Sequence, residues 1–211
     1  MLRIILSAAA LTLLAACSDS QENETAAASV PPPAPVKNLC EIDGNSIGGI
    51  PLGTTLAQVR QSFPNAVLTP VNDAESTEFM SVKLNADVVV FAYADGEGDD
   101  SGRISENRPI TYLETGSPAC KTAHGVHAGM LLKTAEQSYG AVEQIVLSEI
   151  EARQTAEFAN QPATLSFRID DSGSFDDADT DLPKISTEYR DDAKIQSIAV
   201  FGLPEDVAEA Q

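Results

Sequence analysis

Residues 49–63, GIPLGTTLAQVRQSF, are repeated 76 positions later as residues 125–139, GVHAGMLLKTAEQSY. The same offset pairs further identical or similar residues: Gly53 with Gly129, Leu56 with Leu132, Phe63 with Tyr139, Phe91 with Phe167 and Asp95 with Asp171. An ungapped register from Gly49 to Asp95 predicts two copies of one supersecondary unit.

The first copy has the pattern of short strands followed by a short helix. Strands are expected at residues 39–42 and 46–50, and Gly53 then provides a turn. Leu56, Val59 and Phe63 recur at helical spacing, with Thr54 or Thr55 as the N-cap and Pro64 as the stop. Three further strands are expected at residues 78–84, 88–94 and 103–104 continuing to 110–113.

The second copy repeats this order. A helix is expected over residues 131–139, ending at Gly140. Residues 164–169 are the counterpart of 88–93, and residues 194–201 form the closing strand. Leu165, Phe167 and Ile169 alternate with polar residues, as in a half-buried strand.

Residues 142–160, VEQIVLSEIEARQTAEFAN, have the composition of a helix. The repeat instead places them opposite residues 66–85, which have the pattern of strands. Sheet packing can override local propensity, so we expect strands here. The predicted fold is α+β, with modules at residues 39–122 and 123–204, each a short helix packed on an antiparallel sheet. Their helix entries are shaped by four glycines: Gly49, Gly53, Gly125 and Gly129.

The N-terminal residues resemble an export signal. Residues 1–16 hold Arg3 and a short apolar run, and residues 14–17, LAAC, resemble the lipobox of bacterial lipoproteins. We therefore expect Cys17 to be acylated and to anchor the chain in a membrane, because several acyl chains hold a protein durably. An ordinary secretory signal with a chance cysteine is the alternative. Residues 17–38 are polar and proline-rich, as in a disordered tether, and residues 205–211 form an acidic tail.

Two cysteines remain, Cys40 and Cys120, and each lies a few residues before a repeat. An exported compartment is oxidising, so we expect these two to form a disulfide that ties the module entrances together. Two unrelated buried thiols are the alternative. Neither lies in a CxxC pair, so the sequence does not indicate a redox enzyme.

The composition argues against several partners. The formal net charge is −19, so nucleic acid and anionic lipid headgroups would repel the chain. The sequence has no Trp and few aromatic residues, which disfavours a stacking platform for sugars or bases.

Two acidic stretches have spacings similar to a calcium-binding EF-hand loop, but both lack its glycine. They comprise Asp177, Asp179, Asp181 and Glu188 in the second module, and Asp95, Glu97, Asp99 and Glu106 in the first. We expect solvated acidic turns. His124 and His127 are expected to be ordinary turn or strand residues, because zinc would need further ligands. No metal or cofactor is predicted, and no catalytic motif is found, so the chain is not expected to be an enzyme.

The glycine-bounded helix entry followed by strands resembles the tandem modules of small envelope lipoproteins. The generic version is similar to the SmpA/OmlA type of outer-membrane assembly lipoprotein and to the β-lactamase-inhibitor fold. Residues 46–50, 103–104, 125–126 with Gly129, and 194–201 more specifically resemble the sigma-E-regulated lipoprotein family. This resemblance implies an envelope stress or maintenance role with no assigned activity.

Together these features predict a lipid-anchored, periplasm-facing binding or scaffold protein of the bacterial envelope, at the outer membrane. Its surface would lie on the sheets or in the groove between modules, and its partner would be another envelope protein. One alternative is an inhibitor-like or calcium-sequestering protein that uses the acidic loops. A second alternative is a cell-wall hydrolase. The oligomeric state is left open.

Overall fold

The structure is a computed structural model that describes residues 40–73, 77–94, 104–148, 153–170, 173–175 and 184–202. The chain forms two units, residues 1–36 and 37–211, and all described residues belong to the second. Neither of the helices in these described ranges is long or apolar enough to cross a membrane.

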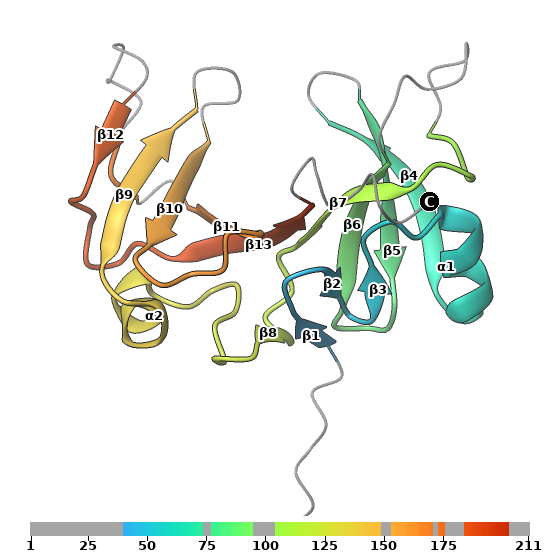
Figure 1. Cartoon of the computed structure of the whole chain (residues 1–211), viewed down its shortest axis with the longest axis horizontal. Helices are drawn as coiled ribbons and strands as arrows, with labels where there is room; N and C mark the ends of the chain where they lie inside the picture. The colour runs from blue at the N-terminus through green and yellow to red at the C-terminus, as the bar shows by residue number, and fades with distance from the viewer. Residues whose placement is uncertain are drawn as a thin grey trace, which may run out of the picture. The chain divides into compact units, whose positions relative to one another are not determined.

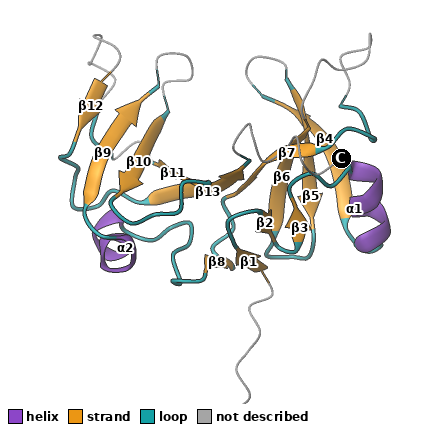
Figure 2. Cartoon of the chain, viewed as in Figure 1, coloured by secondary structure: helices purple, strands orange, loops and turns teal. Residues whose placement is uncertain are grey.

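The described residues form the predicted α+β fold, with two short helices and many antiparallel strands (Figure 2). The helices are α1 (Leu56–Ser62) and α2 (Leu132–Tyr139). The strands are β1 (Cys40–Ile42), β2 (Ser46–Ile47), β3 (Ile50–Pro51), β4 (Val67–Asn72), β5 (Glu78–Lys83), β6 (Val89–Ala94), β7 (Ile110–Thr115), β8 (Cys120–Thr122), β9 (Val142–Leu147), β10 (Gln154–Phe158), β11 (Leu165–Ile169), β12 (Lys184–Ser186) and β13 (Ile195–Phe201).

Nine strands form one continuous sheet in the order β12-β9-β10-β11-β13-β7-β6-β5-β4 (Figure 1). The first module contributes β4 to β7 as a meander, and the second contributes β9, β10, β11 and β13 in mirrored order. The last strands that the two modules contribute to this sheet, β7 and β13, pair antiparallel and join the halves. A second, four-stranded sheet has the order β3-β2-β1-β8, in which β1 and β8 run parallel.

The repeat is confirmed at the helices, because α1 and α2 begin 76 residues apart at Leu56 and Leu132. Each glycine turn is also hydrogen-bonded to the last strand that its module contributes to the nine-stranded sheet. The Gly53 N–H donates to the carbonyl of Ile110 at 2.8 Å, and the Gly129 N–H donates to that of Ile195 at 2.7 Å. Each module thus closes by the same backbone contact.

The ungapped register is wrong beyond the β5–β6 and β10–β11 connections. Met80 lies opposite Ala92, whereas its counterpart Ala156 lies opposite Phe167, so the equivalent of Phe167 is Ala92 and not Phe91. The connection in the second copy is one residue shorter. Because side chains alternate between faces, this single residue moves Phe91 to the opposite face from Phe167. The Phe–Phe match in the sequence is therefore not a structural equivalence.

Of the other expected strands, some are confirmed and others are wrong. Within residues 142–160 the structure has the strands β9 and β10, so the expectation of strands is confirmed. Ile104 lies outside any strand, and Arg103 lies outside the described residues. The sequence did not predict β12, which pairs with β9 at the far edge of the sheet. Its three residues add a strand that has no counterpart among the described residues of the first module.

The core lies between the helices and one face of the nine-stranded sheet. Apolar residues of both helices are buried in one cluster with this face: Leu56, Val59, Leu132, Ala135 and Tyr139. The Tyr139 ring lies 5.5 Å from that of Phe167 and 6.3 Å from that of Phe158. Each helix is too short to be stable alone and is stabilised by the packing of its apolar side against the sheet.

The expected pairing of Cys40 and Cys120 is present in the structure. The two cysteines lie directly opposite each other on the parallel strands β1 and β8, and both are buried. The disulfide therefore links the entrances of the two modules and closes a loop across a sequence separation of 80 residues.

The helix caps give a matched test of local stability. Thr55 accepts a hydrogen bond from the Gln58 N–H, and Gln58 accepts one from the Thr55 N–H, which forms a capping box. Leu131, the N-cap of α2, makes no side-chain cap bond. Thr55→Ala should lower the free energy of unfolding by about 1 kcal/mol in urea denaturation. Leu131→Ala, which removes no cap bond, should cost less; an equal loss from both variants would contradict this account.

Substituting Gly129 tests whether the glycine turns are needed for stability. The φ of Gly129 is +85°, and a Cβ added there would meet no atom within 4 Å, so any cost of substitution comes from the backbone. Gly129→Val should lower the free energy of unfolding by roughly 2 kcal/mol, because branched residues disfavour positive φ. Exposed Gly116, whose Cβ would lie at an ordinary 3.4 Å from the Gln196 carbonyl, is the control as Gly116→Ala. An unchanged Tm for Gly129→Val would contradict the prediction.

Candidate functional site

The outer face is the face of the nine-stranded sheet that points away from α1 and α2. Alternation assigns its residues: Phe79, Ser81, Phe91, Tyr93, Tyr112, Glu114, Ser197, Ala199, Phe201, Ser166, Arg168 and Thr155. One row runs across five strands in the order Ser81, Phe91, Glu114, Ala199 and Ser166. The row crosses from one module to the other without interruption at β7 and β13. The outer face is therefore a single surface built from both copies.

Aromatic side chains gather on the first-module half of the outer face. The Phe79 ring stacks on that of Tyr93 at 4.6 Å and meets that of Phe91 edge-on at 5.5 Å. Tyr93 meets Tyr112 edge-on at 5.4 Å. The register then places Phe201 of the second module opposite Tyr112. Large rings of this kind bring apolar area and, in tyrosine, a polar hydroxyl, which is the composition typical of protein interfaces.

Glu114 lies at the centre of the outer face, on β7. Glu114 is only 8% exposed, and its Oε1 accepts a hydrogen bond from the hydroxyl of Ser197 on β13. Ser197 and Ala199 are also buried, at 6% and 3% exposure, although they point away from the helices. A carboxylate is therefore held in a sheltered position where the two modules meet.

A pocket of about 300 Å³ opens beside Glu114. Residues of both modules line it: Asp73, Tyr93, Tyr112 and Glu114 from the first, and Arg153 from the second. Carboxylate and phenol oxygens accept hydrogen bonds, while the guanidinium of Arg153 donates them. A second hollow of about 350 Å³ lies over the second module and is lined by Glu143, Thr155, Glu157, Phe158, Gln161, Ala163, Leu165, Ser166 and Phe201.

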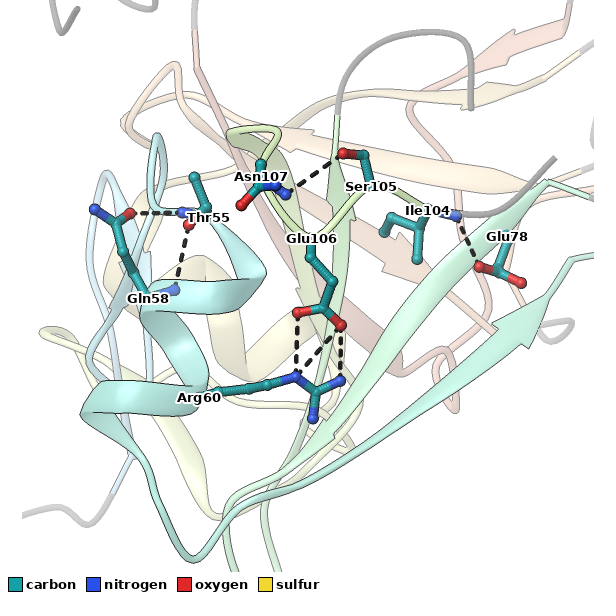
Figure 3. Close-up of polar contacts among 8 residues, drawn as sticks. All are labelled: Thr55, Gln58, Arg60, Glu78, Ile104, Ser105, Glu106 and Asn107. Carbon is teal, nitrogen blue, oxygen red and sulfur yellow. Dashed lines mark hydrogen bonds and ion pairs between the residues drawn. The ribbon is translucent and has the colours of Figure 1, made fainter. Parts of the chain in front are cut away.

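An ion pair fixes the first helix to the loop before β7 (Figure 3). The Arg60 guanidinium donates three hydrogen bonds to the Glu106 carboxylate: Nη2 to Oε1 at 2.9 Å, Nε to Oε2 at 3.1 Å and Nε to Oε1 at 3.3 Å. The Ala57 N–H also donates to the Glu106 carbonyl at 3.0 Å. Nearby, the Ile104 N–H donates to the carboxylate of Glu78 at 2.7 Å. Glu106 is thus held by Arg60.

Hydrogen bonding from Arg60 lowers the pKa of Glu106 below its ordinary value. Because the folded pKa is depressed, the pair stabilises the fold above the ordinary pKa of glutamate and ceases to do so as pH falls through the lowered value. Both side chains are almost half exposed, so the effect on stability is small. Arg60→Gln should raise the pKa of Glu106 in an NMR titration of its carboxyl carbon, and an unchanged pKa would contradict this.

The other predicted residues either lie outside the described ranges or lie apart from the outer face. Cys17 lies outside the described residues, as do Asp95, Glu97, Asp99, Asp177, Asp179 and Asp181. Gly49, Gly53, Gly125 and Gly129 all have positive φ and lie at the helix entries, away from the outer face. The His124 ring meets Tyr139 edge-on, and Nδ1 of His127 hydrogen-bonds the Ala128 carbonyl. Among the described residues, no three metal-binding side chains come together.

Sequence reasoning missed Glu114, Tyr112 and Arg153. A signal for the first two was present in ITYLET, residues 110–115, where they alternate with Leu113 as in a strand with one buried face. The sequence around Arg153 contains no such signal, because Arg153 joins the pocket only through the pairing of β7 with β13. The register error also concealed that Phe91 belongs to the outer face.

Comparisons with known proteins support the fold alone. The chain is similar to the crystal structure of the uncharacterized protein yfeY from Escherichia coli, with a TM-score of 0.50 and 12% sequence identity. The match covers 77% of this chain and 99% of that one. No protein-family model matches the sequence, and neither does any curated protein.

Proposed function

We propose that this chain is a lipid-anchored protein of the bacterial cell envelope that binds another envelope protein through its outer face. The lipobox-like sequence before Cys17 supports the anchor, and the proline-rich residues that follow support a tether. The resemblance to the sigma-E-regulated lipoproteins supports a role in envelope maintenance or stress. In this proposal the protein faces the periplasm from the outer membrane and acts by binding, without catalysis.

One observation carries the binding role. The outer face continues across both modules and combines an aromatic cluster with a sheltered carboxylate at the β7–β13 junction. Interfaces typically have aromatic residues at the centre and polar groups that fix orientation. The helices are already packed on the other face of the sheet, so the outer face is the sheet face left to meet a partner.

Site-specific crosslinking in cells tests this proposal. A photoreactive amino acid at position 91 or 166, on the outer face, should capture one envelope protein that mass spectrometry identifies reproducibly. The matched control is position 133 on α2, where the Lys133 side chain is 72% exposed. Capture from position 133 but not from 91 and 166 would reject the outer face as the binding surface.

The anchor is tested separately. Cys17→Ala should move the protein from the membrane fraction to the soluble periplasmic fraction, because its acylation site is lost. The loss of mass expected for the missing lipid gives an independent readout. Retention in the membrane fraction would count against Cys17 as the anchor and would leave the crosslinking result unaffected.

A further inference from the structure

We infer that the pocket beside Glu114 binds the cationic end of a lysine or arginine side chain of the protein partner. The inference rests on the proposed function, because it names the chemistry by which the outer face would recognise that partner. The pocket is lined by Glu114, Asp73, Tyr93, Tyr112 and Arg153. Its volume of about 300 Å³ suits one long side chain.

Glu114 supplies the main reason. Glu114 is more than nine-tenths buried, and removing a carboxylate from water is costly unless hydrogen bonds and an opposite charge compensate. A carboxylate can accept about four hydrogen bonds. Among the described residues, the Ser197 hydroxyl is the donor that Glu114 meets. An ammonium or guanidinium group entering the pocket would donate further hydrogen bonds to Glu114 and bring a positive charge close to it.

The surroundings also favour a cation. The row that contains Glu114 places Phe91 on one side and Ala199 on the other, so the carboxylate lies between apolar groups that strengthen its field. The Tyr93 and Tyr112 rings line the same pocket, and the faces of aromatic rings attract cations. The net charge of −19 adds a long-range attraction for positively charged partners.

Substituting Arg153 tests whether the pocket binds a cation or an anion. Arg153 is the basic residue among the five that line the pocket, against two carboxylates. If the pocket takes a cation, Arg153 opposes binding, and neutralising it should strengthen the interaction. If the pocket instead takes an anion, Arg153 would be its main ligand, and the same substitution should abolish binding. The two chemistries thus predict opposite results for one variant.

The experiment is an NMR titration of the full chain with three small probes: n-butylguanidinium, n-butylammonium and propionate. We expect both cations to shift the amide signals of residues 113–115 and Ser197, and propionate to leave them unchanged. Glu114→Gln, which keeps the shape and an acceptor for Ser197, should weaken cation binding at least tenfold. Arg153→Gln should tighten it about threefold. Glu41→Gln, at an exposed glutamate of β1, controls for the loss of one negative charge.

Several outcomes would overturn the inference. Equal weakening by Glu41→Gln and Glu114→Gln would indicate attraction by net charge alone. Propionate binding that is lost in Arg153→Gln would identify an anion site. Putrescine binding much more tightly than an acetylated and amidated lysine would assign the pocket to a free amine. If Glu114→Gln fails to fold, Ser197→Ala replaces it, and it should retain cation binding because the charge remains.

The same variants separate this inference from the proposed function. Loss of the crosslinked partner in Glu114→Gln, with retention in Glu41→Gln, would support both. Undiminished capture by Glu114→Gln would overturn the pocket and leave the binding role standing. Cation binding to the purified protein, without any captured protein in cells, would support the chemistry of the pocket and reject the proposed function.

Discussion

Replacing Cys40 and Cys120 together by alanine should lower the free energy of unfolding by about 4 kcal/mol. The disulfide closes a loop across a separation of 80 residues, so its loss releases a large amount of conformational freedom in the unfolded chain. Both cysteines are buried on paired strands, so alanine leaves the strands in place and removes little apolar surface. Both cysteines are replaced so that no unpaired thiol remains.

Urea denaturation followed by far-UV circular dichroism measures this effect. A reducing agent should move the unfolding midpoint of the wild-type protein towards that of the double variant, and should leave the variant unchanged. Cys17→Ala in the same assay is the control for removing a cysteine outside the disulfide. A loss below about 1 kcal/mol would indicate that the unfolded chain is already restricted without the disulfide.

The second large effect is expected at Phe167. Phe167→Ala should lower the free energy of unfolding by about 3–5 kcal/mol, because it leaves a cavity in a fully buried position. The ring lies 5.3 Å from that of Phe158 and 5.5 Å from that of Tyr139, so two neighbouring aromatic residues lose contacts at once. None of its side chain is exposed to solvent.

Phe91→Ala is the matched control, since the sequence repeat pairs Phe91 with Phe167. Phe91 is only partly buried on the outer face, so its substitution should cost markedly less stability in urea denaturation. The two variants should therefore separate folding from binding, with Phe91→Ala impairing capture of the partner. Equal losses of stability would contradict the one-residue shift between the modules.

The sequence predicts local structure well where short-range chemistry decides it. Thr55 and Gln58 carry a capping box, and positive φ at Gly53 and Gly129 follows from turns that both copies share. The strands at residues 142–160 were predicted correctly because the repeat outweighed their helical composition. At the helix entries two independent signals agreed with each other, whereas at residues 142–160 they disagreed and the repeat was the better guide.

The errors concern long-range pairing, which one sequence does not encode locally. A connection that is one residue shorter leaves no mark in the amino-acid types, yet it reverses the faces of Phe91 and Phe167. The pairing of β7 with β13 follows from how the halves meet, so neither the outer face nor the position of Glu114 could be derived from either module alone. The strand β12 has no copy in the part of the first module that the structure describes.

The β7–β13 pair also has a consequence for symmetry. Two separate copies of one module, each offering its last strand to the other, would form a twofold dimer with identical residues on both sides of the axis. Within one chain this contact no longer depends on protein concentration, and the two sides are free to differ. Glu114 faces Ala199, and Tyr112 faces Phe201. Covalent fusion thus allows one asymmetric binding site at a position where a true dimer would have to carry a pair.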